Sequence, residues 1–263
     1  NAGLTNLAGA PKFHRVNGDF ELARNPAMAT IGDLRLDSIL GSFTILQNES
    51  LGDILGLDSL QFIGGDFLVQ ENDALINFEG FDQVAYIGGA VTIESNAALQ
   101  NLTGIVLDSF IGNFLLQFNP SLSDLTGLDS LHCAKGAFRI VSNAGLTSLS
   151  GIGRLHLIKR NFAVFDNTNL AHLGDLKIDS VGGNMTIGAN QALGDLLGLD
   201  SLRYVGGFVN IANNATMPDL LGLDSLRVIG GILSITGNTS MTGISGLVAL
   251  DSIMGDLLIM GNS

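Results

Sequence analysis

The chain has 263 residues, of which 46% are apolar and 35 are glycine, and its formal net charge is −13. This composition supplies a continuous core, while the acidic charge argues against nucleic acid as a partner because the chain would repel a phosphate backbone. The single cysteine, Cys133, excludes an intrachain disulfide, and we expect it to fill space as an apolar residue. No stretch reaches the roughly 18 apolar residues of a membrane span.

Asparagine recurs every 23 or 24 residues along the chain. Such a period is typical of a solenoid, in which each repeat forms one coil that buries its apolar side against its neighbours. We therefore predict an all-β, parallel β-solenoid of about eleven coils with little or no helix. We expect a single repeat domain over residues 1–263, belonging to a longer chain. The asparagines that define the register are Asn25, Asn48, Asn72, Asn96, Asn119, Asn143, Asn167, Asn190, Asn214 and Asn238.

The copy at residues 72–95 shows the elements of one coil in chain order. Apolar residues recur after the asparagine up to the glycine pair Gly88-Gly89, which we predict to supply positive φ at a corner. The alternation of Val91 and Ile93 after the pair predicts a short strand with one face inward. The same alternation predicts strands at 67–69, 114–116, 138–140, 185–187 and 257–259.

The recurrent asparagine lies at the corner that follows each predicted strand. Its amide can donate to and accept from the backbone of adjacent coils, so it can satisfy turn groups that would otherwise be buried without a partner. We predict that these asparagines form an inner structural ladder. A second apolar row, such as Leu57 and Leu60, predicts another short strand or an extended side of the coil. Stacked coils then form parallel sheets with strands about 4.8 Å apart.

The charges are segregated along the chain. Between Leu36 and Ala134 there are 13 Asp and Glu residues and no Lys or Arg. A solvated acidic face, charge-matched contact between copies of the chain, and cation binding are all compatible with this distribution. Basic residues then cluster at Lys135, Arg139, Arg154, Lys159, Arg160 and Lys177.

No catalytic or cofactor motif occurs in the sequence. Acidic residues recur as part of the repeat, and no long insertion builds a cleft, so we predict no enzyme and no catalytic, cofactor or metal residues. One repeated carboxylate position can form turns with the local backbone, with calcium binding as the alternative. It comprises Asp58, Asp82, Asp129, Asp200 and Asp224. The histidines show no metal-ligand spacing, and we expect no regular repeat position for them; they are His14, His132, His156 and His172.

Apolar side chains also occur at outward positions of the predicted strands, where a solvated sheet carries polar residues. Scattered apolar residues are common on protein surfaces, whereas a contiguous patch marks contact with another protein or another copy. We predict a contact surface on this side of the coils. Its candidate residues are Leu46, Leu68, Leu115, Val141, Phe165, Phe208, Ile232 and Leu258.

The pattern L-x-x-I-G-G-x-L-x-I-x-x-N-x-x-L is carried by residues 60–75 and again by residues 226–241. It resembles the receptor L-domain type of leucine-rich repeat, over essentially the whole chain. That repeat type implies a right-handed β-solenoid and occurs in growth-factor receptor ectodomains, fungal cell-wall proteins and bacterial surface proteins. Unlike the receptors, the 263 residues of this chain contain no cysteine-rich module, because Cys133 is their single cysteine.

The resemblance implies an extracellular or cell-surface protein without catalytic activity. The function that we expect is adhesion or protein–protein recognition. The alternative is a structural protein whose copies stack end to end or laterally into an extracellular filament. In both cases the partner is a protein or another copy of the chain.

Overall fold

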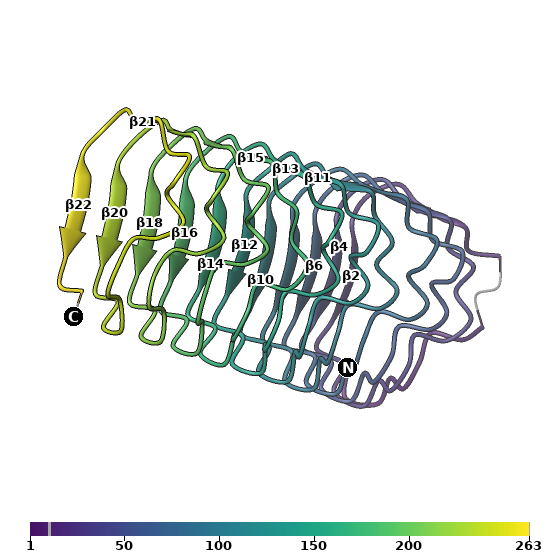
Figure 1. The fold of residues 1–263 in the computed structure, drawn as a ribbon. Helices are drawn as coiled ribbons and strands as arrows, with labels where there is room; N and C mark the ends of the chain where they lie inside the picture. The colour runs from purple at the N-terminus through teal and green to yellow at the C-terminus, as the bar shows by residue number, and fades with distance from the viewer. Residues whose placement is uncertain (10–11, 263) are drawn as a thin grey trace.

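The computed structural model describes residues 1–9 and 12–262, and every regular element in these two ranges is a β-strand. The chain winds into stacked coils, and its two termini lie toward opposite ends of the stack (Figure 1). Each coil contributes one two-residue strand and one four-residue strand, and neighbouring strands are parallel. The predicted all-β parallel solenoid is therefore confirmed.

The four-residue strands form one sheet of eleven strands, which we call the principal sheet. Its strands begin one residue after the glycine corner, and their first and third residues point inward, so apolar residues alternate as predicted. The strands are β2 (Phe20–Ala23), β4 (Phe43–Leu46), β6 (Phe67–Gln70), β8 (Val91–Glu94), β10 (Phe114–Gln117), β12 (Phe138–Val141), β14 (Phe162–Phe165), β16 (Met185–Gly188), β18 (Val209–Ala212), β20 (Leu233–Thr236) and β22 (Leu257–Met260).

The two-residue strands precede the corner and form two smaller sheets. The first sheet contains β1 (Arg15–Val16), β3 (Ser38–Ile39), β5 (Phe62–Ile63) and β7 (Tyr86–Ile87). The second contains β9 (Ser109–Phe110), β11 (Cys133–Ala134), β13 (Leu157–Ile158), β15 (Ser180–Val181), β17 (Tyr204–Val205), β19 (Val228–Ile229) and β21 (Ser252–Ile253).

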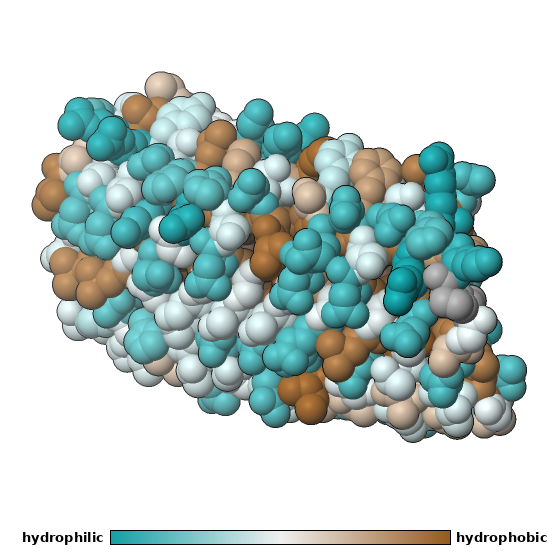
Figure 2. Space-filling view, turned by 90° about the vertical axis from the view of Figure 1, so that its right-hand side faces the viewer, coloured by the Kyte–Doolittle hydropathy of each residue, from teal (hydrophilic) through white to brown (hydrophobic). Residues whose placement is uncertain are grey.

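Equivalent residues of successive coils stack directly on one another, because the strands pair without any shift in register. Phe114 of β10 pairs with Phe138 of β12, and their ring centroids lie 4.7 Å apart in the core. The inward side chains form one continuous apolar core along the stack. On the face of the molecule in Figure 2, by contrast, apolar side chains occur in small separate groups among hydrophilic ones.

The glycine pair does not act as predicted. Gly64 and Gly65 have no positive φ, but a Cβ at Gly64 would fall against the carbonyl oxygen of Leu40 in the preceding coil. Glycine is needed there because successive coils approach closely. Positive φ occurs instead at a second glycine, such as Gly56 (φ 105°), and at the residue before each ladder asparagine, such as Phe118 (φ 55°).

The second apolar row also differs from its predicted form. Leu57 and Leu60 are fully buried, but they lie between turns, and the backbone N–H of Leu60 donates to the carbonyl of Leu57 at 2.8 Å. The short strand forms two residues later, at Phe62–Ile63. The repeated turns therefore bend the coil at the leucine row instead of extending it.

The inner asparagine ladder is confirmed. The side-chain oxygen of Asn143 accepts both the backbone N–H and the side-chain amide of Asn119, at 3.1 and 3.2 Å. Its amide nitrogen donates to the carbonyls of Leu116 and Val141, at 3.0 and 3.1 Å, and to the side-chain oxygen of Asn167 at 3.3 Å. Among the residues described, no buried side-chain nitrogen or oxygen lacks a partner. The ladder thus satisfies the polar groups of an otherwise apolar interior.

None of the described segments forms a helix long and apolar enough to cross a bilayer.

Candidate functional site

The outward face of the principal sheet consists of three rows of side chains that run along the stack. The preceding row contains the residue just before each strand, as Asn113 does before β10. The second row contains the second residue of each strand, and the fourth row contains the fourth, as Leu115 and Gln117 do in β10. Because the register is constant, each row brings together residues that are 23 or 24 positions apart in sequence.

All eight residues of the predicted contact surface lie on this face, but they are dispersed over the three rows. Leu115 pairs in register with Thr92 on one side and Arg139 on the other. Val141 and Phe165 are direct register neighbours. Some of the eight residues are therefore adjacent and others are separated by polar or charged side chains, and their role as a contact surface stays a prediction.

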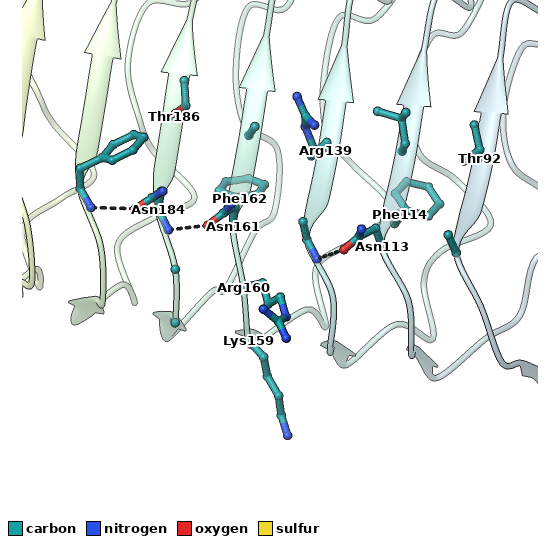
Figure 3. A pocket seen from close by; sticks show the side chains of 17 residues that line it. Thr92, Asn113, Phe114, Arg139, Lys159, Arg160, Asn161, Phe162, Asn184 and Thr186 are labelled. Carbon is teal, nitrogen blue, oxygen red and sulfur yellow. Dashed lines mark hydrogen bonds between the residues drawn. The ribbon is translucent and has the colours of Figure 1, made fainter. Parts of the chain in front are cut away.

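A shallow concavity of about 740 Å³ lies on this face and reaches from the corner before β8 to the corner before β18 (Figure 3). Three basic side chains line it: Arg139 from the second row of β12, and Lys159 and Arg160 from the corner before β14. No Asp or Glu of the described chain lines it. The charged residues of its described lining are therefore all basic, on a protein whose net charge is −13.

The three basic side chains are exposed and have no partner within the described chain. Arg139, Lys159 and Arg160 make neither ion pairs nor side-chain hydrogen bonds to other described residues. Figure 3 shows Arg139 on the sheet face, and Lys159 and Arg160 extending from the corner at the start of β14. Their charge is thus available to a partner and is not needed to balance a carboxylate of the same chain.

Arg160 departs from the repeat at a position where the other coils have glycine. It lies two residues before β14, and in the neighbouring coil a Cβ at the equivalent Gly136 would fall against the carbonyl of Gly112. The repeat therefore does not account for an arginine at this position, and departures from a local rule occur typically at functional positions. The ten other coils have glycine at this position: Gly18, Gly41, Gly65, Gly89, Gly112, Gly136, Gly183, Gly207, Gly231 and Gly255.

Asparagines of the preceding row add further hydrogen-bond donors to the concavity. The side-chain oxygen of Asn161 accepts the backbone N–H of Asn184 at 2.9 Å, and that of Asn184 accepts the N–H of Phe208 at 3.1 Å. The side-chain oxygen of Asn113 likewise accepts the backbone N–H of Ala137 at 2.9 Å (Figure 3). Because the oxygens are engaged with the backbone, the amide nitrogens remain available as donors.

The concavity therefore presents basic groups and amide donors without an acidic group beside them. Such a surface suits carboxylate, sulfate or phosphate groups, because arginine and lysine make charge-assisted hydrogen bonds to oxyanions. Its described lining contains no His, Cys, Asp or Glu.

The repeated carboxylate position forms turns, as one of the two interpretations predicted. Asp58 accepts the backbone N–H of Gly56 at 3.0 Å, and Asp200 accepts that of Gly198 at 2.9 Å. These carboxylates stabilise the turn that contains a positive-φ glycine. Throughout the described ranges, no three His, Cys, Asp or Glu side chains gather as a metal site.

Two expectations about individual residues are wrong. His14, His132 and His156 share one repeat position, directly before the short strand. Cys133 does not fill the core: it is half-buried at an outward position of β11, while Ala134 beside it is fully buried. In a two-residue strand only one residue faces inward, and sequence alone left open which one it is.

The concavity itself was not predicted from the sequence, although its basic residues were recognised as a cluster along the chain. The sequence signal for the concavity is a position within the repeat: Arg160 stands where all ten remaining coils have glycine. No family model, no curated protein and no solved structure matches this chain. The site must therefore be judged by its own geometry and charge.

Proposed function

We propose that this chain is a non-catalytic recognition protein of the cell surface or extracellular space, built from repeats of the receptor L-domain-like leucine-rich type. In this proposal it contacts an acidic partner through the concavity on the principal sheet. The observation that carries the proposal is the set of three unpaired basic side chains, Arg139, Lys159 and Arg160, without a carboxylate of the described chain beside them.

The expected affinity of this surface is moderate. Each exposed ion pair contributes about 0.2–1 kcal/mol, so three pairs of about 0.5 kcal/mol change the affinity roughly tenfold. Arg139 lies on a strand that is hydrogen-bonded on both sides, and Lys159 and Arg160 lie beside the next strand. Binding therefore does not have to order a flexible loop, which would lower the affinity. Charge-based recognition of this kind weakens as salt is added, because the Debye length falls to about 8 Å at physiological ionic strength.

Binding of fluorescent poly-L-glutamate, followed by anisotropy, tests this proposal. The triple variant Arg139→Glu, Lys159→Glu, Arg160→Glu is expected to bind at least about tenfold more weakly than the unmodified chain, because it loses three attractive pairs and adds three repulsive carboxylates. Added salt is expected to reduce binding by the unmodified chain.

The matched control replaces three other basic residues by glutamate, Lys177, Arg203 and Arg227, none of which lines the concavity. It changes the net charge by the same amount and should weaken binding only slightly. Equal losses in the two triple variants would mean that net charge, and not this surface, governs binding, and the proposal would be wrong.

A further inference from the structure

We propose that the acidic partner is a second copy of this chain, bound face to face through the principal sheet. The two copies are related by a twofold axis that runs parallel to the strands and passes over β10. This inference rests on the proposed function, because it takes the same concavity as the contact site. It adds the identity of the partner and the register of the contact.

The outward face of the principal sheet carries acidic residues on strands that precede β10 in the stack. Glu21 and Glu94 point outward from β2 and β8, and Asp19 and Asp66 precede β2 and β6. The basic residues lie on the opposite side of β10, on β12 and before β14. One face thus contains an acidic and a basic half. A twofold contact brings each half against the other twice, because such an interface is self-complementary.

The preceding row shows that the fold does not require this division of charge. Asp66 accepts the backbone N–H of Ala90 at 2.7 Å, which is the bond that Asn161 makes to Asn184 at 2.9 Å. Asp and Asn therefore serve the same backbone role. The carboxylate leaves a spare oxygen acceptor in the acidic half, and the amide leaves a spare nitrogen donor in the basic half. Aspartate in one half and asparagine in the other therefore place acceptors opposite donors when two copies meet face to face.

The position of the axis follows from the positions of the charges. A twofold axis parallel to the strands reverses the order of the strands but keeps their starting ends together. With the axis over β10, β14 faces β6, so Lys159 and Arg160 face Asp66 of the other copy. In the same arrangement β12 faces β8, which places Arg139 opposite the strand that carries Glu94. Leu115, in the second row of β10, faces its own copy.

Two acidic residues near the strand ends lie outside this pairing and are already bonded within their own chain. Glu71 accepts bonds from Gln47 and Gln70, at 2.7 and 3.1 Å, and Asp166 accepts one from Ser142 at 2.8 Å. Asp256, before β22, lies beyond the nine strands β2–β18 that overlap in the pair.

The overlapping face is large enough for a specific contact. Nine four-residue strands cover about 43 Å by 13 Å, or roughly 1,100 Å² when both copies are counted, which lies at the lower end of specific interfaces. The net charge of −13 on each copy opposes association at long range. Screening at physiological ionic strength removes most of that repulsion beyond about 8 Å and leaves the close pairs.

A charge-exchange experiment tests the pairing by sedimentation velocity at physiological ionic strength. The base-reversed variant carries Arg139→Glu, Lys159→Glu and Arg160→Glu. The acid-reversed variant carries Asp66→Asn and Glu94→Lys, the two acidic residues that face the basic half in this register, and asparagine preserves the backbone bond of residue 66. We expect the unmodified chain to form a dimer, each variant alone to be monomeric, and the equimolar mixture to form a heterodimer.

The outcomes separate this inference from the proposed function. If the unmodified chain and the mixture both stay monomeric while the concavity still binds poly-L-glutamate, the partner is not a second copy and the proposed function stands. If the base-reversed variant still forms a homodimer, the basic half is not at the interface and the inference fails. Equal loss of poly-L-glutamate binding in the base-reversed variant and in the control variant at Lys177, Arg203 and Arg227 would overturn the proposed function itself.

A cross-linking experiment tests the axis. Facing sheets lie about 10 Å apart, which is too far for a direct disulfide, so a short thiol-to-thiol cross-linker is used. Leu115→Cys in a Cys133→Ser background is expected to cross-link into dimers, because residue 115 faces its own copy. Thr186→Cys in the same background, which lies on β16 and faces β4, is the control and should not. Equal cross-linking by both variants, or none at residue 115, would overturn this axis.

Discussion

Replacing Asn143 by leucine should destabilise the solenoid by about 1–3 kcal/mol. The change removes the side-chain oxygen that accepts the buried Asn119 backbone N–H at 3.1 Å, and leaving this N–H unpaired costs about 1–3 kcal/mol. It also removes a donor from the carbonyls of Leu116 and Val141, at about 0.5–1.5 kcal/mol each. The buried leucine side chain offsets roughly 1.5–3 kcal/mol of this sum.

Urea unfolding followed by circular dichroism measures this loss. The matched control is Asn169→Leu, which makes the same substitution at an exposed asparagine with one surface hydrogen bond, to the carbonyl of Ala144 at 2.8 Å. We expect the control to change stability by no more than about 0.5 kcal/mol. If the Asn143→Leu curve coincided with that of the unmodified chain, or if the control lost as much, the ladder would not carry the buried hydrogen bonds that we assign to it.

Three further substitutions test the backbone roles that the structure assigns to glycine. Phe118→Gly should raise stability by about 0.5–1 kcal/mol, because Phe118 has a φ of 55° and is 49% exposed, so a lower urea midpoint would contradict the strain argument. Gly206→Ala should cost about 1–3 kcal/mol, because its Cβ would fall against the carbonyl oxygen of Gly182. Gly194→Ala is the control, because no atom lies within 4 Å of the new Cβ, and it should be neutral or stabilising by up to about 1 kcal/mol. Equal losses of stability at Gly206 and Gly194 would refute the close-approach argument.

The strands and the ladder were predictable because a stack of identical coils repeats its constraints in the sequence. The alternation of Phe67 and Val69 sets the inward face of β6, and the asparagine at position 72 has to satisfy buried backbone groups beside it. The glycine pair was misinterpreted because close approach and positive φ both select glycine. Sequence alone does not separate these causes, whereas the distance to the preceding coil does.

The candidate site was predictable only in part. The basic residues 135–177 were visible as a cluster, but residues 139, 159 and 160 share one surface only because a parallel register stacks consecutive coils. Arg154 and Lys177 belong to the same cluster in sequence yet line a different hollow, with Asp129 and Asp175. Position within the coil, and not proximity in the chain, decides which charges meet.

The sequence by itself determined the solenoid, the four-residue strands and the buried asparagines, because each of these follows from a constraint that recurs in every coil. The tertiary structure alone decided which residues form the outward rows and which of them lack partners. The physical reason is that binding surfaces arise from differences between coils. These differences carry no period, and they acquire meaning only when neighbouring strands bring them together on one face.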